Sequence, residues 1–341
     1  MAEDLEKLNR FARARGFDFL HFIEDCVSGN DLSRKLSPDM LMLRFKSAVT
    51  SSLNTLAPDL ALPVAGCVIV RSICGRGTMD RVMNLLCALC CASSLTLLWT
   101  DGQRQLTTLI DGLIEATGTL TPALVSASAL AGGSFWPSAA ASLSALCALF
   151  LDRMLRDWGL KLCGMAAMAA LCCAVAGRNA LSRLFDLAQS AARWLLASAM
   201  FIYGALVSAQ GIAGASLDGA AMRAARSAIE SVVPVIGGGV SDAAGSIAGS
   251  IGAAKGVIGI AGVALLLHMC LMPLLRIGTN ALALRLVAAT TEPLADGAVS
   301  ELTGRFGALM ETLFAIGVCA VAMAAMLPTC CAVIAVNLQL A

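Results

Sequence analysis

Long uncharged apolar runs, separated by shorter charged segments, dominate the pattern of this chain of 341 residues. The clearest run extends from Gly256 to Leu275 and holds 20 residues without a charge. At a rise of about 1.5 Å per residue, a helix of that length crosses a hydrocarbon core of roughly 30 Å. A second run, from Val82 to Thr100, ends near Trp99, as is typical of an aromatic side chain at a membrane surface. Both runs predict transmembrane helices.

Further apolar runs bring the predicted total to about seven spans. The run from Ala116 to Leu151 contains Gly132-Gly-Ser-Phe-Trp-Pro137 in its middle, which favours a hairpin of two short helices, with a re-entrant first half as one arrangement. The other predicted spans are a weak first one between Asp59 and Arg71, then Leu162 to Gly177, Trp194 to Leu217, and Thr312 to the C-terminus. The expected fold class is all-α, a polytopic helical membrane protein.

Some charged segments between these runs have helical patterning of their own. From Leu106 onward, residues 101–117 carry apolar side chains at i, i+3, i+4, i+7 and i+8, with charges on the rest of the helical wheel. We expect this segment to lie in the membrane interface as an amphipathic helix. Residues 178–193 and 218–231 are also polar and patterned as helices.

The first 55 residues form the only long charged region and are expected to lie outside the bilayer as amphipathic helices. Ser37 before Pro38 suits the N-terminus of one such helix. The start, Met1-Ala-Glu-Asp-Leu-Glu, has no apolar run behind a basic end, so we expect no signal peptide in the sequence as given. The chain therefore divides into a peripheral segment over 1–55 and a polytopic transmembrane domain over 56–341.

The glycine-rich motif of residues 232–277 is the stretch around which the chain is organised. Glycines four residues apart fall on one helical face, where a second helix can approach closely. The residues expected to serve helix packing or assembly are Pro234, Gly237, Gly245, Gly249, Gly252 and Gly256. Lys255 lies just before the following span, as an interfacial anchor or as a functional charge. The other charged candidates are Arg223, Arg226, Asp242, Arg276 and Asp296.

The amino-acid composition limits the classes of function that this chain can have. Hydrophobic residues make up 58% of the chain and charged residues 14%, against about 25% charged in an ordinary soluble domain. The net charge of +1 provides no basic field for nucleic acid. Cys87 and Cys90 have the spacing of a metal or redox pair, but they lie in a predicted span and the chain has only two histidines, so we expect no metal and no cofactor. Without a histidine cluster or paired acids in a span, we expect no enzyme.

Basic residues give conflicting orientations. Basic loops tend to face the cytoplasm, so the segments around Arg76 and Arg156 should be separated by an even number of crossings. The basic residues around Arg183 follow one predicted span later and fall on the opposite side by the same count. The rule therefore contradicts itself somewhere along the chain.

Several motifs together indicate a family. In the second half they are Asp218-Gly-Ala-Ala-Met-Arg-Ala-Ala-Arg226, Val233-Pro-Val-Ile-Gly237, Ser241-Asp-Ala-Ala244, Lys255 followed by Gly259-Ile-Ala-Gly262, the run from Leu265 to Pro273 with Arg276 after it, and Glu292-Pro-Leu-Ala-Asp296. Weaker ones upstream are Ile110-Asp111, Thr121-Pro122 and Gly132-Gly133. Over roughly residues 40 to 341, the chain resembles the stage III sporulation protein AE family, polytopic membrane proteins of endospore-forming bacteria.

The resemblance implies a non-enzymatic component of a secretion-like complex in the mother-cell membrane around the forespore. Such a complex joins the two cells and sustains late forespore gene expression. The implied partners are the lipid bilayer, other membrane proteins of the complex and, as one form of assembly, further copies of this chain. Known members begin with a signal-like segment that this sequence lacks as given.

A secondary transporter or permease is the alternative. The broken apolar segments Gly132–Pro137 and Pro234–Gly239, and charges such as Asp242 and Lys255, are typical of the discontinuous helices of transporters. A transporter should carry corresponding breaks in its two halves, and these two breaks share no sequence pattern. The sequence therefore favours an assembly component.

Overall fold

The computed structural model describes residues 78–130, 135–176, 181–209, 257–291 and 297–339, together with isolated positions between residues 9 and 50. Side chains are described within 86–122, 143–174, 181–206, 261–291 and 299–326. All five long segments are helical. The predicted all-α class is confirmed for this part of the chain.

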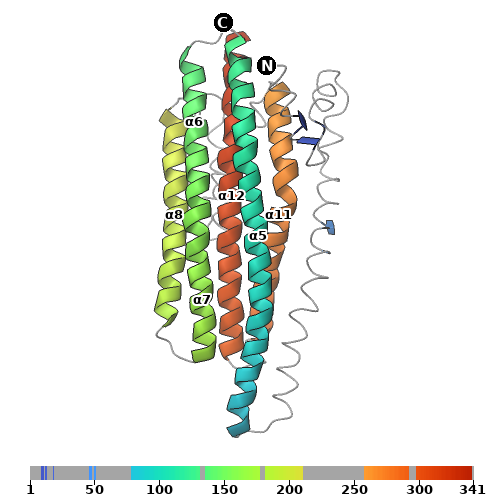
Figure 1. Ribbon diagram of the computed structural model, residues 1–341, viewed down its shortest axis with the longest axis vertical. Helices are drawn as coiled ribbons and strands as arrows, with labels where there is room; N and C mark the ends of the chain where they lie inside the picture. Colours follow the sequence, from blue (N-terminus) through green and yellow to red (C-terminus); the bar gives the residue numbers. More distant parts are fainter. Residues whose placement is uncertain are drawn as a thin grey trace, which may run out of the picture.

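Six α-helices and one π-helix build these segments. They are α5 (Thr78–Leu130), α6 (Phe135–Met154), the π-helix η1 (Leu155–Gly159), α7 (Leu160–Ala176), α8 (Ser182–Ala209), α11 (Val257–Thr291) and α12 (Gly297–Gln339). Because α6, η1 and α7 follow one another without a break, they form one continuous helix, which we call the α6–α7 rod. The helices lie side by side along the long axis of the bundle (Figure 1).

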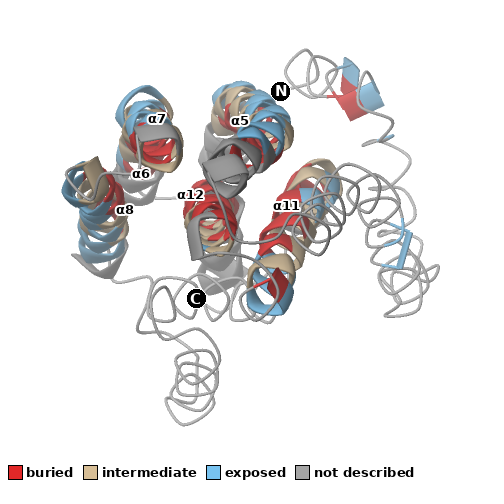
Figure 2. Cartoon of the chain, turned by 90° about the horizontal axis from the view of Figure 1, so that it is seen from below, coloured by how far each residue is buried: buried red, intermediate tan, exposed pale blue. Residues whose placement is uncertain are grey.

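Helix α12 lies in the middle of the bundle, with α5, the α6–α7 rod, α8 and α11 around it (Figure 2). Side chains on several sides of α12 are buried, including Phe306 and Ile316. Trp99 of α5 packs edge-on against Phe306, with 6.5 Å between ring centroids. Tyr203 of α8 donates a hydrogen bond of 2.9 Å to the carbonyl oxygen of Met323. From Thr312 onward α12 is uncharged and apolar on all sides, and such a helix is stable when its neighbours cover it, as they do here on three sides (Figure 2).

Contacts to α12 give the directions of its neighbours. On α11, Leu274 lies against Gly317 and Gly278 lies against Phe314, so the two helices are antiparallel. Helices α5 and α8 run parallel to α12, and the α6–α7 rod runs antiparallel to it (Figure 1). The C-terminal end of α12 therefore lies at the same end of the bundle as the N-terminal ends of α6 and α11.

Within the described residues, three helices are long and apolar enough to cross a membrane. Their candidate spans are Leu143–Ala174, Ala261–Thr291 and Val299–Met326. This result supports a helical membrane protein and includes the predicted run from Gly256 to Leu275 in part. The total of seven spans is not confirmed and stays a prediction, and the weak first span before Arg71 lies outside the described residues.

The prediction of a separate interfacial helix over residues 101–117 is wrong. These residues form the middle of the 53-residue helix α5. The predicted apolar face is buried, but it packs into the core of the bundle, where Leu106, Ile110 and Leu113 are fully buried. An amphipathic stripe has the same spacing whether it covers a membrane surface or a neighbouring helix, so the period alone could not separate the two.

The charged segment around Arg156 is also not the loop between spans that the sequence suggested. It continues the helix through η1, and the separate short span predicted from Leu162 to Gly177 is the second half of the α6–α7 rod. Leu155 and Leu160 point into the core while Asp157 is exposed. Because the charges occupy the outer face of a helix whose inner face is apolar, the helix has no reason to end there.

The turn predicted at Gly132–Pro137 lies partly outside the described residues and stays a prediction. Helix α5 ends at Leu130 and α6 begins at Phe135. The helices on either side are long, not short as predicted, because the segments beyond the two apolar arms continue the same helices.

Candidate functional site

A group of charged residues lies on α5 and the α6–α7 rod, two neighbouring helices of the bundle. Its members, which we call the charged face, are Asp111 and Glu115 of α5 and Arg153, Arg156 and Asp157 of the rod. Glu115, Arg153 and Asp157 are exposed, and the other two are partly buried. The charged face therefore spans two helices. Its members Asp111 and Arg156, which form a hydrogen bond, are 45 residues apart in the sequence.

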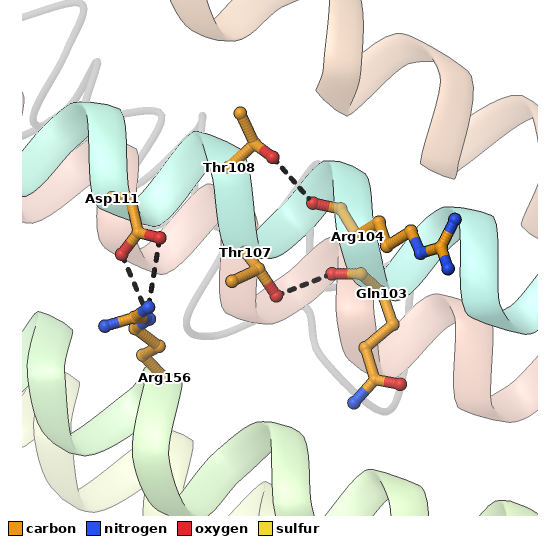
Figure 3. A network of polar contacts seen from close by, with 6 residues as sticks. All are labelled: Gln103, Arg104, Thr107, Thr108, Asp111 and Arg156. Atoms are coloured by element: carbon orange, nitrogen blue, oxygen red, sulfur yellow. Dashed lines mark hydrogen bonds and ion pairs between the residues drawn. The ribbon is translucent and has the colours of Figure 1, made fainter.

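Asp111 and Arg156 form a two-pronged ion pair between α5 and the rod. Arg156 Nε lies 3.0 Å from Asp111 Oδ1, and Arg156 Nη2 lies 3.1 Å from Asp111 Oδ2. Figure 3 shows the two side chains meeting between the helices. The neighbouring Thr107 and Thr108 instead donate hydrogen bonds to carbonyl oxygens one turn earlier in α5. Bidentate pairs of this kind fix orientation as well as distance, so the pair sets how α5 faces the rod.

Arg156 belongs to the π-helix η1. A π-helical turn is rare, occurs mostly as a single turn within an α-helix, and is frequent at functional sites. Its extra residue changes the direction in which the following side chains point. Here Leu155 and Gly159 are buried at the two ends of the turn, and Arg156 between them reaches α5.

Asp152 lies one turn before Arg156 and faces the interior of the bundle. Its side chain is 0% exposed, and neither carboxyl oxygen has a hydrogen-bond partner. It lies within electrostatic range of the thiols of Cys270 on α11 and Cys319 on α12. Buried polar groups nearly always have partners, so a buried carboxyl without one marks a candidate functional position. In the described part of the chain, no three His, Cys, Asp or Glu side chains are placed to hold a metal ion.

At the level of the charged face, the three other helices are uncharged. Gly159, two residues after Asp157, marks the edge of this level that is nearer the N-terminal end of α12, because a Cβ built on it would stand 3.5 Å from Ile316 of α12 and 3.7 Å from Leu195 of α8. No charged residue occurs from Trp194 to the end of α8, from the start of α11 to Leu275, or from Thr312 to the end of α12. One side of the bundle is thus charged at a height where the other sides are apolar.

Only one of the residues singled out from the sequence lies in the described part, namely Arg276, which is exposed on α11. The others lie outside it: Pro234, Gly237, Gly245, Gly249, Gly252, Gly256, Arg223, Arg226, Asp242, Lys255 and Asp296. Their packing and charge roles stay predictions.

Sequence reasoning missed both the ion pair and Asp152. The charges around Arg156 suggest a loop, and a loop residue gives no reason to expect a partner on another helix. A signal for Asp152 was present, since it follows Ala145 and Ala148 at helical spacing and all three prove to be buried. A carboxyl that continues a stripe of small apolar residues predicts a buried acid.

Two comparisons with known proteins identify relatives, and a third finds none. The family model described as stage III sporulation protein AE matches residues 41–336. Over 135 residues, the chain is 27% identical to stage III sporulation protein AE of Bacillus subtilis (strain 168). The aligned residues make up 40% of this chain and 34% of that relative. The match thus spans about a third of the relative's length. No solved structure matches.

The family match covers the whole described bundle except the last residues of α12. It also includes the glycine-rich motif of residues 232–277, which carried much of the resemblance in the sequence. This chain therefore belongs to the stage III sporulation protein AE family.

Proposed function

We propose that this protein is a non-enzymatic membrane component of a secretion-like channel complex that links mother cell and forespore during sporulation. In this proposal it is a multi-pass protein of the mother-cell membrane around the forespore, and late forespore gene expression requires it. It acts by assembly with other membrane proteins, and further copies of this chain are one form of that assembly.

The observation that carries the proposal is the combination of a filled centre and a charged outer face. Helix α12 occupies the middle of the described bundle, so a path for solutes would run between chains and not along the axis of one chain. Arg153 and Asp157 are exposed at a level where α8, α11 and α12 are uncharged. Charges at that depth are costly beside lipid, which favours a protein neighbour or water at the charged face.

Affinity purification from sporulating cells in mild detergent tests the proposal. We expect the tagged chain to bring down other membrane proteins of the complex and a deletion strain to lose heat-resistant spores. Arg153→Ala with Asp157→Ala should release those partners. The matched control, Arg183→Ala with Asp186→Ala, also removes one exposed basic and one exposed acidic residue, but from α8, and should keep them. Purification as a lone chain, together with normal spores in the deletion strain, would exclude the proposal.

A secondary transporter is the second candidate, and Asp152 favours it. Buried ionisable groups in membrane helices often lie on ion pathways. Against it, α11 and α12 continue as unbroken helices past this level, whereas transporter sites are typically built from discontinuous helices. The purified chain alone in liposomes separates the two: a transporter would accumulate a solute against its gradient, and an assembly component would not.

A further inference from the structure

Four basic residues on four different helices lie at one level of the bundle. They are Arg104 of α5, Lys161 of α7, Arg193 of α8 and Arg276 of α11, and we call them the basic collar. Arg104, Lys161 and Arg276 are exposed, and Arg193 is partly buried. Their helices surround α12 on three sides (Figure 2).

The shared level follows from two glycine contacts. Gly317 of α12 lies against Leu106 of α5 and Leu274 of α11, since a Cβ built on it would stand 3.1 Å and 2.7 Å from them. Gly159 lies against Leu195 and against Ile316, which is the residue before Gly317. Leu106, Leu274, Gly159 and Leu195 therefore mark one level on four helices.

Each basic residue of the collar lies two positions from its marker, and all four lie on the same side. On α5 and α8, which run parallel to α12, the arginine precedes the marker, and on α7 and α11, which run antiparallel, the basic residue follows it. Two residues correspond to about 3 Å along a helix. The collar thus lies about 3 Å from the Ile316–Gly317 level, toward the N-terminal end of α12.

None of the four collar side chains forms an ion pair in the described structure. Three other arginines of the bundle do pair with acids, including Arg285, whose partner is Glu311. The nearest acids along the same helices are Asp101 and Asp157, each about one turn away, and neither pairs with the collar. Four unpaired positive charges at one height favour an anionic partner from outside the chain.

Two exposed tryptophans lie within about one helical turn of this height. Trp194 is next to Arg193 and is 74% exposed, and Trp158 is three residues from Lys161 and 66% exposed. Trp99, by contrast, is buried against α12. Exposed tryptophans and basic residues at one level are the combination found where a membrane protein passes through the lipid headgroups.

The uncharged runs of α5 (82–100) and α7 (162–176) lie toward the N-terminal end of α12, whereas α8, α11 and α12 place the hydrocarbon toward its C-terminal end. On that side α8, α11 and α12 carry no charge to their ends. On the other side all three do, for example Asp186, Arg285 and Glu301. The uncharged part of α11, from Val257 to Leu275, measures about 28 Å at 1.5 Å per residue, close to the thickness of a hydrocarbon core.

We propose that the basic collar binds the anionic phospholipid headgroups of one leaflet and so sets the depth of the bundle in the membrane. By the positive-inside rule, this leaflet is the cytoplasmic one. The partner is an anionic phospholipid held in the bilayer, not a free anion, and the proposal is independent of the role in sporulation.

Lipid selectivity of the purified full-length protein tests this assignment. The protein is equilibrated with equal amounts of phosphatidylglycerol and phosphatidylethanolamine of the same acyl chains, and the retained lipids are counted by native mass spectrometry. We expect the unaltered protein to retain phosphatidylglycerol preferentially. Arg104→Gln with Arg276→Gln should lower that preference about tenfold or more, because each basic residue near an anionic surface contributes on the order of 1 kcal/mol.

The matched control is Arg183→Gln with Arg285→Gln, which removes the same charge from two exposed arginines about 14 Å below the collar. It should keep the preference. Equal loss in the two double variants, or no preference in the unaltered protein, would overturn the proposal. Displacement of the lipid by inorganic phosphate, but not by chloride of the same ionic strength, would show a site for a free anion and would equally overturn it.

Tryptophan fluorescence measures the depth of the collar in the membrane without removing any of its charges. Variants that keep only Trp158 or only Trp194, with the other tryptophans changed to Phe, are placed in bilayers whose lipids carry bromine at a shallow or a deep acyl position. Shallow bromine should quench both tryptophans more strongly. Stronger quenching by deep bromine would place the collar inside the hydrocarbon and contradict the assignment.

Discussion

The charged face and the apolar tracts of α8, α11 and α12 lie at the same height but have opposite chemistry. On one side Asp111 and Arg156 pair between helices and Glu115 and Arg153 face outward. On the other sides there is no charge from Trp194 onward in α8 or before Arg276 in α11. A bundle surrounded evenly by lipid would be apolar on all sides at one depth. This difference is what the proposed assembly with other membrane proteins would require, because such a protein meets different neighbours on its different sides.

The structure removes one assumption behind the conflict in the basic-residue rule. Counting spans along the sequence places Lys161 and Arg193 on opposite sides of the membrane, because the count treats residues 153–161 as a loop followed by a short span. In the structure both residues lie in the basic collar, on helices connected at the N-terminal end of α12. The charges in residues 153–161 therefore lie along one continuous helix. They do not mark a loop between two spans.

Three substitutions test this comparison, taken in order of their expected effect on the amount of folded protein. The largest should come from Gly317→Leu, at the point where α5 and α11 both touch α12. A Cβ at this glycine already stands 2.7 Å from Leu274, so a leucine forces the helices apart. We expect a loss of about 3 kcal/mol, the upper range for overpacking a core, and little protein in the membrane fraction by immunoblot.

Gly204→Leu is the control for this substitution. Gly204 is exposed on α8 and has nothing within 4 Å of an added Cβ. The variant should accumulate as well as the unaltered protein. If the two leucine variants accumulated equally, close packing around α12 would not hold the two sides of the bundle together.

A smaller loss is expected from Arg156→Glu, which places two acids in contact across α5 and the rod. Both partners are close to half exposed, so the pair itself contributes on the order of 1 kcal/mol or less if water reaches it. The exchanged variant, Asp111→Arg with Arg156→Glu, restores opposite charges and should recover most of the thermal stability in detergent. The extent of recovery measures how much thermal stability comes from the pairing of the two charges and not from either charge alone. No recovery would mean that the contact contributes nothing to the fold.

Much of the fold was accessible from the sequence, and the reason for each failure is physical. Apolar length predicted α11 and the apolar part of α8, because about 20 uncharged residues have few other solutions. The stripe that begins at Leu106 was correctly identified as a buried face, but its partner was not, since a neighbouring helix and a membrane surface demand the same spacing. The burial of Asp152 depends on helices that are distant in sequence, which no local pattern contains.

The candidate site was harder to predict than the fold. The glycine-rich motif and Lys255 were chosen by local composition, and they lie outside the described residues. The ion pair between Asp111 and Arg156 can be predicted only if the rod is known to be one continuous helix. The charges within the rod instead suggest that a helix ends there. Charged segments were read as boundaries, although an exposed helix face tolerates charge without ending.

The smallest effect on folding should come from Asp152→Asn, and here function is the informative measurement. Neither carboxyl oxygen makes a hydrogen bond, so the substitution breaks none, and we expect a stability change below about 1 kcal/mol. If the carboxyl is retained for what the complex does, heat-resistant spores should fall at least tenfold while the protein accumulates normally. Asp186→Asn, which removes an exposed carboxyl from α8, should leave spores unchanged. Normal spore formation by Asp152→Asn would show that the buried carboxyl is only tolerated. The contrast between the two sides of the bundle would then rest on the exposed charges alone.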